Sequence, residues 1–81
     1  MKQDSLYPKG STLLDLYLRL DKMERRKRFA CTQRTAEIVG VSRRTIQLWI
    51  ESGQIEAVRV SKKYQVDLSS VEQYLHSVAV S

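Results

Sequence analysis

Apolar residues recur at helical spacing in four stretches of the chain, and an alternating pattern separates the third stretch from the fourth. The first stretch begins after Ser11, a residue type that caps helices, and continues to Met23. Its apolar side chains cover well over half of the helix circumference, which leaves one narrow polar strip. The pattern predicts an amphipathic helix over 11–28 that ends in the basic run 25–28, preceded by a flexible lead over 1–10.

Two shorter helices are predicted next, with a tight turn between them. Thr32 is the cap candidate of the first helix, which stops at Gly40, where glycine suits a left-handed helix end. Ser42 is the cap candidate of the second helix, over 43–51. Two short helices joined in this way form a helix-turn-helix.

The second of these helices separates a core face from an outward face. Three of its apolar residues point one way, with Thr45 at the edge, and we expect them to be core: Ile46, Trp49 and Ile50. The opposite face carries four residues, with Arg43 on the N-terminal flank: Arg44, Gln47, Leu48 and Glu51. Arginine pairs bidentately with guanine and glutamine with adenine, so this helix suits the major groove of DNA.

Beyond residue 53 the apolar spacing changes to two. It predicts a strand from Ile55 to Val60, a turn over 61–63 and a return strand over 64–66. Asp67 then caps a last helix whose apolar stripe is Leu68, Val71, Tyr74, Leu75 and Val78. The order of elements predicts a mainly α fold with a small β-hairpin wing. This is a winged helix-turn-helix domain over 29–81 with an extra N-terminal helix.

Composition and charge narrow the function. The chain has 81 residues and a formal charge of +5, enough for one domain with one small core. Residues 25–63 carry a net charge of +7, whereas 1–24 are neutral and 64–81 carry −2. A basic middle of this kind is typical of a polyanion-binding face. Charge alone leaves an ordinary solvated surface equally open, and the same two alternatives stand for the run 25–28.

Candidate chemistry outside binding is sparse. The one cysteine, Cys31, and the one histidine, His76, have no motif around them, which excludes a disulfide and a four-ligand zinc site built by this chain. We expect Cys31 to be a small buried apolar residue and His76 to lie at the surface. No stretch has the length of a membrane span or the pattern of a signal peptide. We therefore expect an intracellular binding module rather than an enzyme, without a cofactor.

Residues 31–75 combine two capped helices, a turn glycine, a core tryptophan and a basic wing in one register. The matching runs are 32–42, 43–46, 49–53, 57–60, 62–64 and 71–75. In this combination the chain resembles the excisionase-like, MerR-type winged helix-turn-helix domains of bacteria and their phages. The resemblance implies double-stranded DNA as partner and a cytoplasmic, nucleoid-associated location. It implies no small-molecule effector, because the chain ends shortly after the last matched helix, where ligand-sensing relatives continue.

The resemblance also implies roles for single residues. In the major groove it implies Arg43, Arg44, Thr45 and Gln47; in the wing it implies Lys62, Lys63 and Tyr64, with Arg59 near the DNA backbone. We add Arg34, which stands where such domains often have an acidic residue, as a further DNA-contact candidate. The helix and the wing each depart from such domains at one position. Leu48 replaces a commonly basic residue, and Ser61 stands where the wing often has glycine.

The leading hypothesis is sequence-specific binding of double-stranded DNA through helix 43–51 and wing 61–64. The protein would act as a small transcription regulator or as an excisionase-type recombination factor, two roles that the sequence does not separate. One alternative is a protein-interaction module that uses the apolar helix 12–23; another is the DNA-targeting part of a recombinase or transposase. Met1 and the apolar stripe ending near Val80 favour a complete small protein.

The wide apolar arc of the N-terminal helix bears on assembly. Leu13, Leu16, Tyr17 and Leu20 form one stripe, which Leu14 and Leu18 widen. Simple packing over the domain explains the stripe, and a contact with a second copy explains its width. We expect one edge to cover the winged domain and the other to be free for a homodimer or a head-to-tail assembly on DNA.

Overall fold

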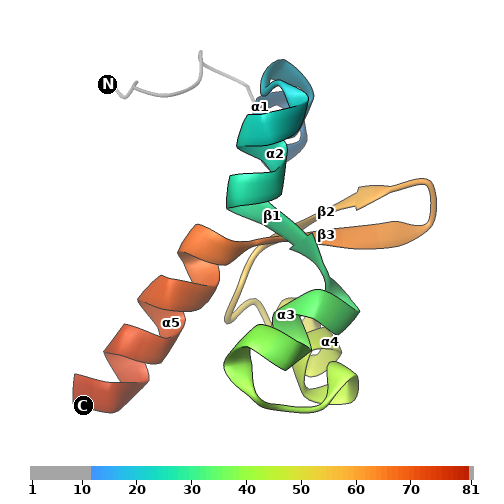
Figure 1. Cartoon of the computed structure of the whole chain (residues 1–81). Helices are drawn as coiled ribbons and strands as arrows, with labels where there is room; N and C mark the ends of the chain where they lie inside the picture. Colours follow the sequence, from blue (N-terminus) through green and yellow to red (C-terminus); the bar gives the residue numbers. More distant parts are fainter. Residues whose placement is uncertain (1–11, 81) are drawn as a thin grey trace.

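The computed structural model describes residues 12–80 of the chain (Figure 1). The elements in chain order are α1 Leu13–Arg19, α2 Lys22–Arg28, β1 Phe29–Cys31, α3 Thr32–Val39, α4 Arg43–Glu51, β2 Ala57–Val60, β3 Lys63–Asp67 and α5 Leu68–Val80. The predicted fold class, mainly α with a small β-hairpin wing, is confirmed. The predicted flexible lead over 1–10 and the predicted cap Ser11 lie outside the described residues.

The three strands form one antiparallel sheet in the order β1-β3-β2, with α1 and α2 on one side of it and α3 and α4 on the other (Figure 1). Residues directly opposite each other in antiparallel strands share a face. Val66 lies opposite Ala57, so these two residues point to one face. Val58 lies opposite Gln65, so both point to the other face. Each face of the sheet therefore buries its own set of side chains.

The larger core lies on the face that carries Val66. Its buried members come from α3, α4, the segment before β2, β3 and α5: Ala36, Ile46, Ile55, Val66 and Val71. Partly buried side chains complete it, among them Trp49, whose ring meets that of Tyr74 edge-on with centroids 5.1 Å apart. Trp49 is thus a half-buried member of the core face, as the helical pattern predicted. This core joins the helix-turn-helix, the hairpin and the last helix into one unit.

The local signals that shape the helix-turn-helix act as expected. Gly40 ends α3 in the left-handed region at φ 89°, where a side chain would cost energy. Ser42 caps α4, because its hydroxyl accepts a hydrogen bond from the backbone N–H of Thr45 at 3.1 Å. The predicted bounds of helix 43–51 are confirmed.

The predicted single N-terminal helix is wrong, because the structure divides it into α1 and α2. Thr12 caps α1 and forms a reciprocal capping box with Asp15. Asp21 caps α2, its carboxylate accepting from the backbone N–H of Glu24 at 2.9 Å. The extended backbone of Leu20 separates the two helices. Asp21 thus starts a new helix although the apolar spacing runs on past it.

The N-terminal helices cover the second face of the sheet. Leu16 of α1 is buried there with Phe29 of β1 and Val58 of β2, and the ring of Tyr17 meets that of Phe29 edge-on at 5.0 Å. This contact holds three buried apolar side chains, whereas the larger core holds five. As predicted, α1 buries one edge and leaves Leu14 and Leu18 exposed.

Four further differences from the predictions appear. Residues 29–31, for which the sequence pattern predicted no strand, form a strand that pairs with β3. Cys31 is exposed rather than buried, and it replaces Thr32 as the cap of α3, its Sγ lying 3.4 Å from the backbone nitrogen of Arg34. The wing turn is shorter than residues 61–63, because Lys63 already belongs to β3. His76 lies at the surface, as expected.

Candidate nucleic-acid interface

Helix α4 is anchored through one side and presents the other to solvent. Ile46 is fully buried in the larger core. The opposite side is exposed along the length of the helix, with Arg43 exposed at its start: Arg44, Gln47, Leu48 and Glu51. Among residues 12–80 neither Arg43 nor Arg44 takes part in an ion pair within 4 Å, so both guanidinium groups are available to an external acceptor.

Thr45 differs from the other candidates on α4 because it is half-buried. Its hydroxyl lies 3.0 Å from the Ser42 hydroxyl, and its backbone N–H is held by the same cap. These contacts fix the first turn of α4. Thr45 therefore sets the direction of the helix start, beside the exposed arginines.

The wing is a tight hairpin with a basic tip, and Figure 1 shows it projecting beyond α3 and α4. Its two turn residues, Ser61 and Lys62, have positive φ values of 50° and 70°. Positive φ at both central positions is the geometry of a type I′ turn, which matches the twist of the strands but favours glycine and asparagine. The turn is thus as tight as hairpins allow despite Ser61. It exposes the side chains of Lys62 and Lys63.

A paired arginine and tyrosine lie behind the tip. Arg59 and Tyr64 are directly opposite each other in the β2–β3 ladder, on the sheet face that carries the larger core. The exposed Arg59 guanidinium lies 5.7 Å from the centre of the half-buried Tyr64 ring. This cation–π contact orients Arg59 without neutralising its charge.

Arg34 lies on α3 and is exposed. Its guanidinium is 3.7 Å from the Glu37 carboxylate, and both side chains are more than half exposed. Exposed pairs of this kind contribute less than about 1 kcal/mol, so the pair leaves Arg34 able to exchange partners.

The basic run 25–28 is divided in its roles. Arg25 donates to the backbone carbonyls of Tyr17 at 2.6 Å and Leu18 at 3.0 Å, and its guanidinium lies over the Tyr17 ring at 4.7 Å. These carbonyls belong to the last turn of α1, where basic side chains are favourable. Arg25 is therefore an internal clamp between α1 and α2.

The other end of the run is also engaged. The Nε of Arg28 lies 3.5 Å from Oδ1 of Asp67, which is only 4% exposed and also accepts from the backbone N–H of Ser69 at 3.0 Å. Asp67 is thus the cap of α5 that the sequence predicted. In this run only Arg26 and Lys27 are exposed. Half of the most basic stretch of the sequence is committed to the fold.

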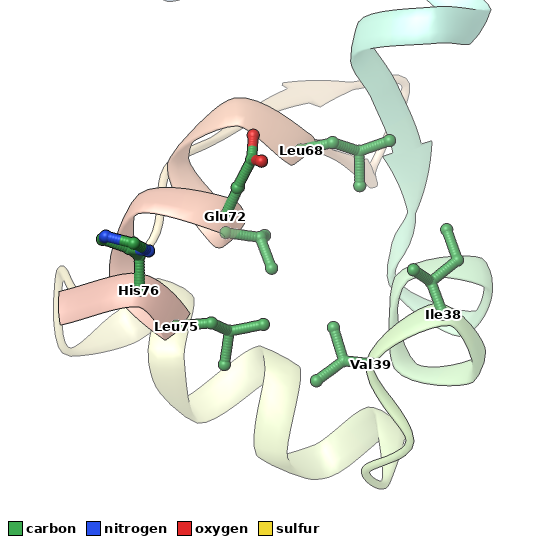
Figure 2. A pocket seen from close by; sticks show the side chains of 7 residues that line it. Ile38, Val39, Leu68, Glu72, Leu75 and His76 are labelled. Atoms are coloured by element: carbon green, nitrogen blue, oxygen red, sulfur yellow. The ribbon is translucent and has the colours of Figure 1, made fainter. Parts of the chain in front are cut away.

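An apolar groove between α3 and α5 was not predicted (Figure 2). It has a volume of about 510 Å³ and is lined by Ile38, Val39, Leu68, Val71, Glu72, Leu75 and His76. Figure 2 shows the aliphatic side chains of the two helices pointing toward one another across it. The sequence feature that points to this groove is the apolar stripe of the last helix. The core does not bury the whole stripe, since Leu75 is 37% exposed.

No group of three or more His, Cys, Asp or Glu residues within 12–80 is arranged to hold a metal ion. No helix in the same part of the chain is both long and apolar enough to cross a membrane.

Comparison with known proteins defines the class. A family model described as a helix-turn-helix domain matches residues 32–78, more than half of the chain. The chain therefore belongs to this helix-turn-helix family, an excisionase-like one, and DNA binding is the function that such a domain implies. No curated protein and no solved structure matches the chain. The match covers α3 to α5 and leaves α1, α2 and β1 outside it.

Proposed function

We propose that this protein binds duplex DNA sequence-specifically, with α4 in the major groove and the wing beside it. One observation carries the proposal: α4 buries Ile46 and leaves Arg44 and Gln47 exposed on the opposite side, next to an exposed Arg43. Arginine and glutamine are the side chains that read guanine and adenine edges by paired hydrogen bonds. In this arrangement α4 supplies the base contacts.

The remaining candidates hold the DNA backbone. Lys62 and Lys63 at the exposed hairpin tip reach phosphates or the adjacent minor groove. Arg59, steered by Tyr64, and Arg34 on α3 contribute further phosphate contacts. Thr45 positions the first turn of α4 at the edge of the major groove through its contact with Ser42. These contacts set affinity and register rather than sequence preference.

Within this function the protein acts as a small transcription regulator or as an excisionase-type recombination factor on bacterial or phage DNA, in the cytoplasm. Both roles use the same helix and wing, and the arrangement of binding sites distinguishes them. Selection of bound sequences from a random duplex pool gives that arrangement directly. A palindromic product reports a two-fold pair, and tandem repeats report a head-to-tail assembly.

Pairing on DNA is part of the proposal. One winged domain contacts one short half-site, and linking two weak contacts multiplies their effect. Leu14 is 39% exposed and Leu18 is 58% exposed, although the same helix buries Leu16. The double variant Leu14→Glu with Leu18→Glu should keep its fold yet bind a double site no more tightly than a single one. Strictly non-cooperative binding by the unmutated protein in band-shift titrations would leave α1 as simple packing.

The same exposed leucines favour the second candidate function, a protein-interaction module. The two candidate functions are distinguished by what the protein binds. A partner held through Leu14 and Leu18 with no measurable duplex binding would favour the module. Duplex binding that survives the double variant at a single site would favour the DNA-binding function.

The base-reading assignment is tested by a pair of matched substitutions. Arg44→Ala should lower affinity by about 1–3 kcal/mol and relax the preference at one base pair, because it removes a base contact. Lys63→Ala should weaken all sequences alike, because it removes a phosphate contact. Binding to a panel of single-base variants measures both effects. If both substitutions lowered affinity uniformly, α4 would not be the base-reading helix.

A further inference from the structure

Leu48 is an apolar residue on the polar side of α4. Its side chain is 49% exposed, whereas Ile46 on the same helix is fully buried. Helix spacing places Leu48 next to Arg44, four residues before it, and Glu51, three residues after it. Leu48 therefore lies on the exposed side of α4, beside the arginine that reads a base in the proposed function.

The isolation of Leu48 distinguishes it from the other exposed large apolar residues. Within the described part of the chain these lie on α1, α2, α3 and α5, and two of them, Ile38 and Leu75, line one groove. Leu48 is the only exposed large apolar residue on α4. Protein-docking surfaces are contiguous apolar patches, so a single leucine between charged side chains does not fit one. An aliphatic side chain also forms no hydrogen bond to a phosphate.

The major groove offers one apolar group among the four bases, the C5 methyl of thymine. We propose that Leu48 is a specificity-determining residue that packs against a thymine methyl in the major groove. This assignment rests on the proposed function, because it requires α4 to lie in that groove. Leu48 lies about 6 Å along the helix axis from Arg44. The thymine is therefore within about two base pairs of the base that Arg44 reads.

The contact gives leucine a role in base recognition at a position where the domains that this chain resembles commonly carry a basic residue. A basic side chain at this position adds affinity without sequence preference, whereas an aliphatic one adds preference for a single base. In the free protein the Leu48 side chain is half exposed to water, and the thymine methyl removes part of that exposure. Leucine at this position thus adds discrimination between bases, whereas a basic residue would add charge and affinity.

Uracil tests this contact cleanly, because it differs from thymine only in lacking the methyl group. Starting from the selected binding site, each thymine is replaced by uracil in turn and the dissociation constant is measured. One replacement should weaken binding of the unmutated protein about fourfold, as expected for one methyl group lost from a buried contact. The Leu48→Ala variant should bind the thymine site more weakly and should not distinguish thymine from uracil at that position.

Two controls sharpen the result. Leu75→Ala changes an exposed leucine on α5 and should keep the full methyl sensitivity. Replacing the same thymine by cytosine should weaken binding, and 5-methylcytosine should recover part of the loss because it restores the methyl group. Recovery should be present with Leu48 and absent with Leu48→Ala.

Each other outcome overturns the assignment. If no thymine is sensitive to loss of its methyl group, Leu48 reads none. If Leu48→Ala keeps the unmutated protein's sensitivity, another residue makes the contact. Sequence-specific binding that persists in either case leaves the proposed function intact. A selection that yields no preferred sequence overturns the proposed function, and this assignment with it.

Discussion

The two sides of the sheet are held in different ways. The helix-turn-helix side has a continuous apolar core to which α3, α4, α5 and the hairpin all contribute. The N-terminal side buries little more than Leu16, Phe29 and Val58 and is fastened by two arginines, Arg25 and Arg28, which reach backbone carbonyls and a buried carboxylate. One region depends on apolar burial, and the other depends largely on directed polar contacts.

The difference separates structural arginines from those that can bind a ligand. Arg25 and Arg28 stand in the densest basic run of the chain, yet their charges are used inside the fold. Arg43 and Arg44 carry the same charge, and both are exposed on a helix that packs on the larger core. A high density of basic residues therefore does not by itself mark a DNA-binding surface.

The largest expected effect is on the apolar side. Trp49→Ala should lower the free energy of unfolding by about 2–4 kcal/mol, because a half-buried ring leaves the core and its contact with Tyr74. Denaturant titration measures the change. Leu48→Ala, one residue away and exposed, should shift stability by less than about 0.5 kcal/mol. A Trp49→Ala protein that folds normally and loses only DNA binding would contradict this placement.

The second effect concerns the ion pair between Arg28 and Asp67 on the N-terminal side. Arg28→Ala should cost about 1–3 kcal/mol of stability, because Asp67 is left buried at the end of β3 without its cationic partner. Arg26→Ala, two residues earlier and exposed, is the matched control and should change stability by less than about 0.5 kcal/mol. Equal effects from the two substitutions would show that the run is not divided as described.

The smallest effect is at the wing tip. Ser61→Asn combined with Lys62→Gly should stabilise the fold by up to about 1 kcal/mol, since asparagine and glycine tolerate the positive φ that both positions require. Thermal unfolding measures the gain. The same variant should bind all DNA sequences more weakly, because it removes one phosphate contact. A loss of stability would show that the turn does not require positive φ.

The sequence predicted the helix-turn-helix side well because its signals are local. Gly40 ends one helix, Ser42 starts the next, and the spacing of Ile46 and Trp49 orients α4. The exposure of Arg43 and Arg44 follows from the same spacing. Their contact with DNA stays a prediction, because exposure makes a side chain available without identifying what it binds.

The N-terminal side was predicted less well because its determinants are distant or hidden. Asp21 followed three residues later by Glu24 is a pattern typical of a helix start. The apolar spacing continues across this point, and for that reason it predicted one helix instead of two. Strand β1 has three residues and exists through its pairing with β3, a contact that no local pattern contains. The role of Arg28 likewise depends on Asp67, which lies far along the chain.

The salt dependence of DNA binding tests the central claim most directly. If the exposed basic residues of the segment 25–63 bind phosphates, about five to eight contacts give a slope of log affinity against log salt of about −4 to −7. Lys62→Ala with Lys63→Ala should make the slope shallower by about 2, whereas Lys22→Ala on α2 should leave it unchanged. A slope shallower than about −2 for the unmutated protein would contradict the account, because the basic surface would then not be the DNA-binding face.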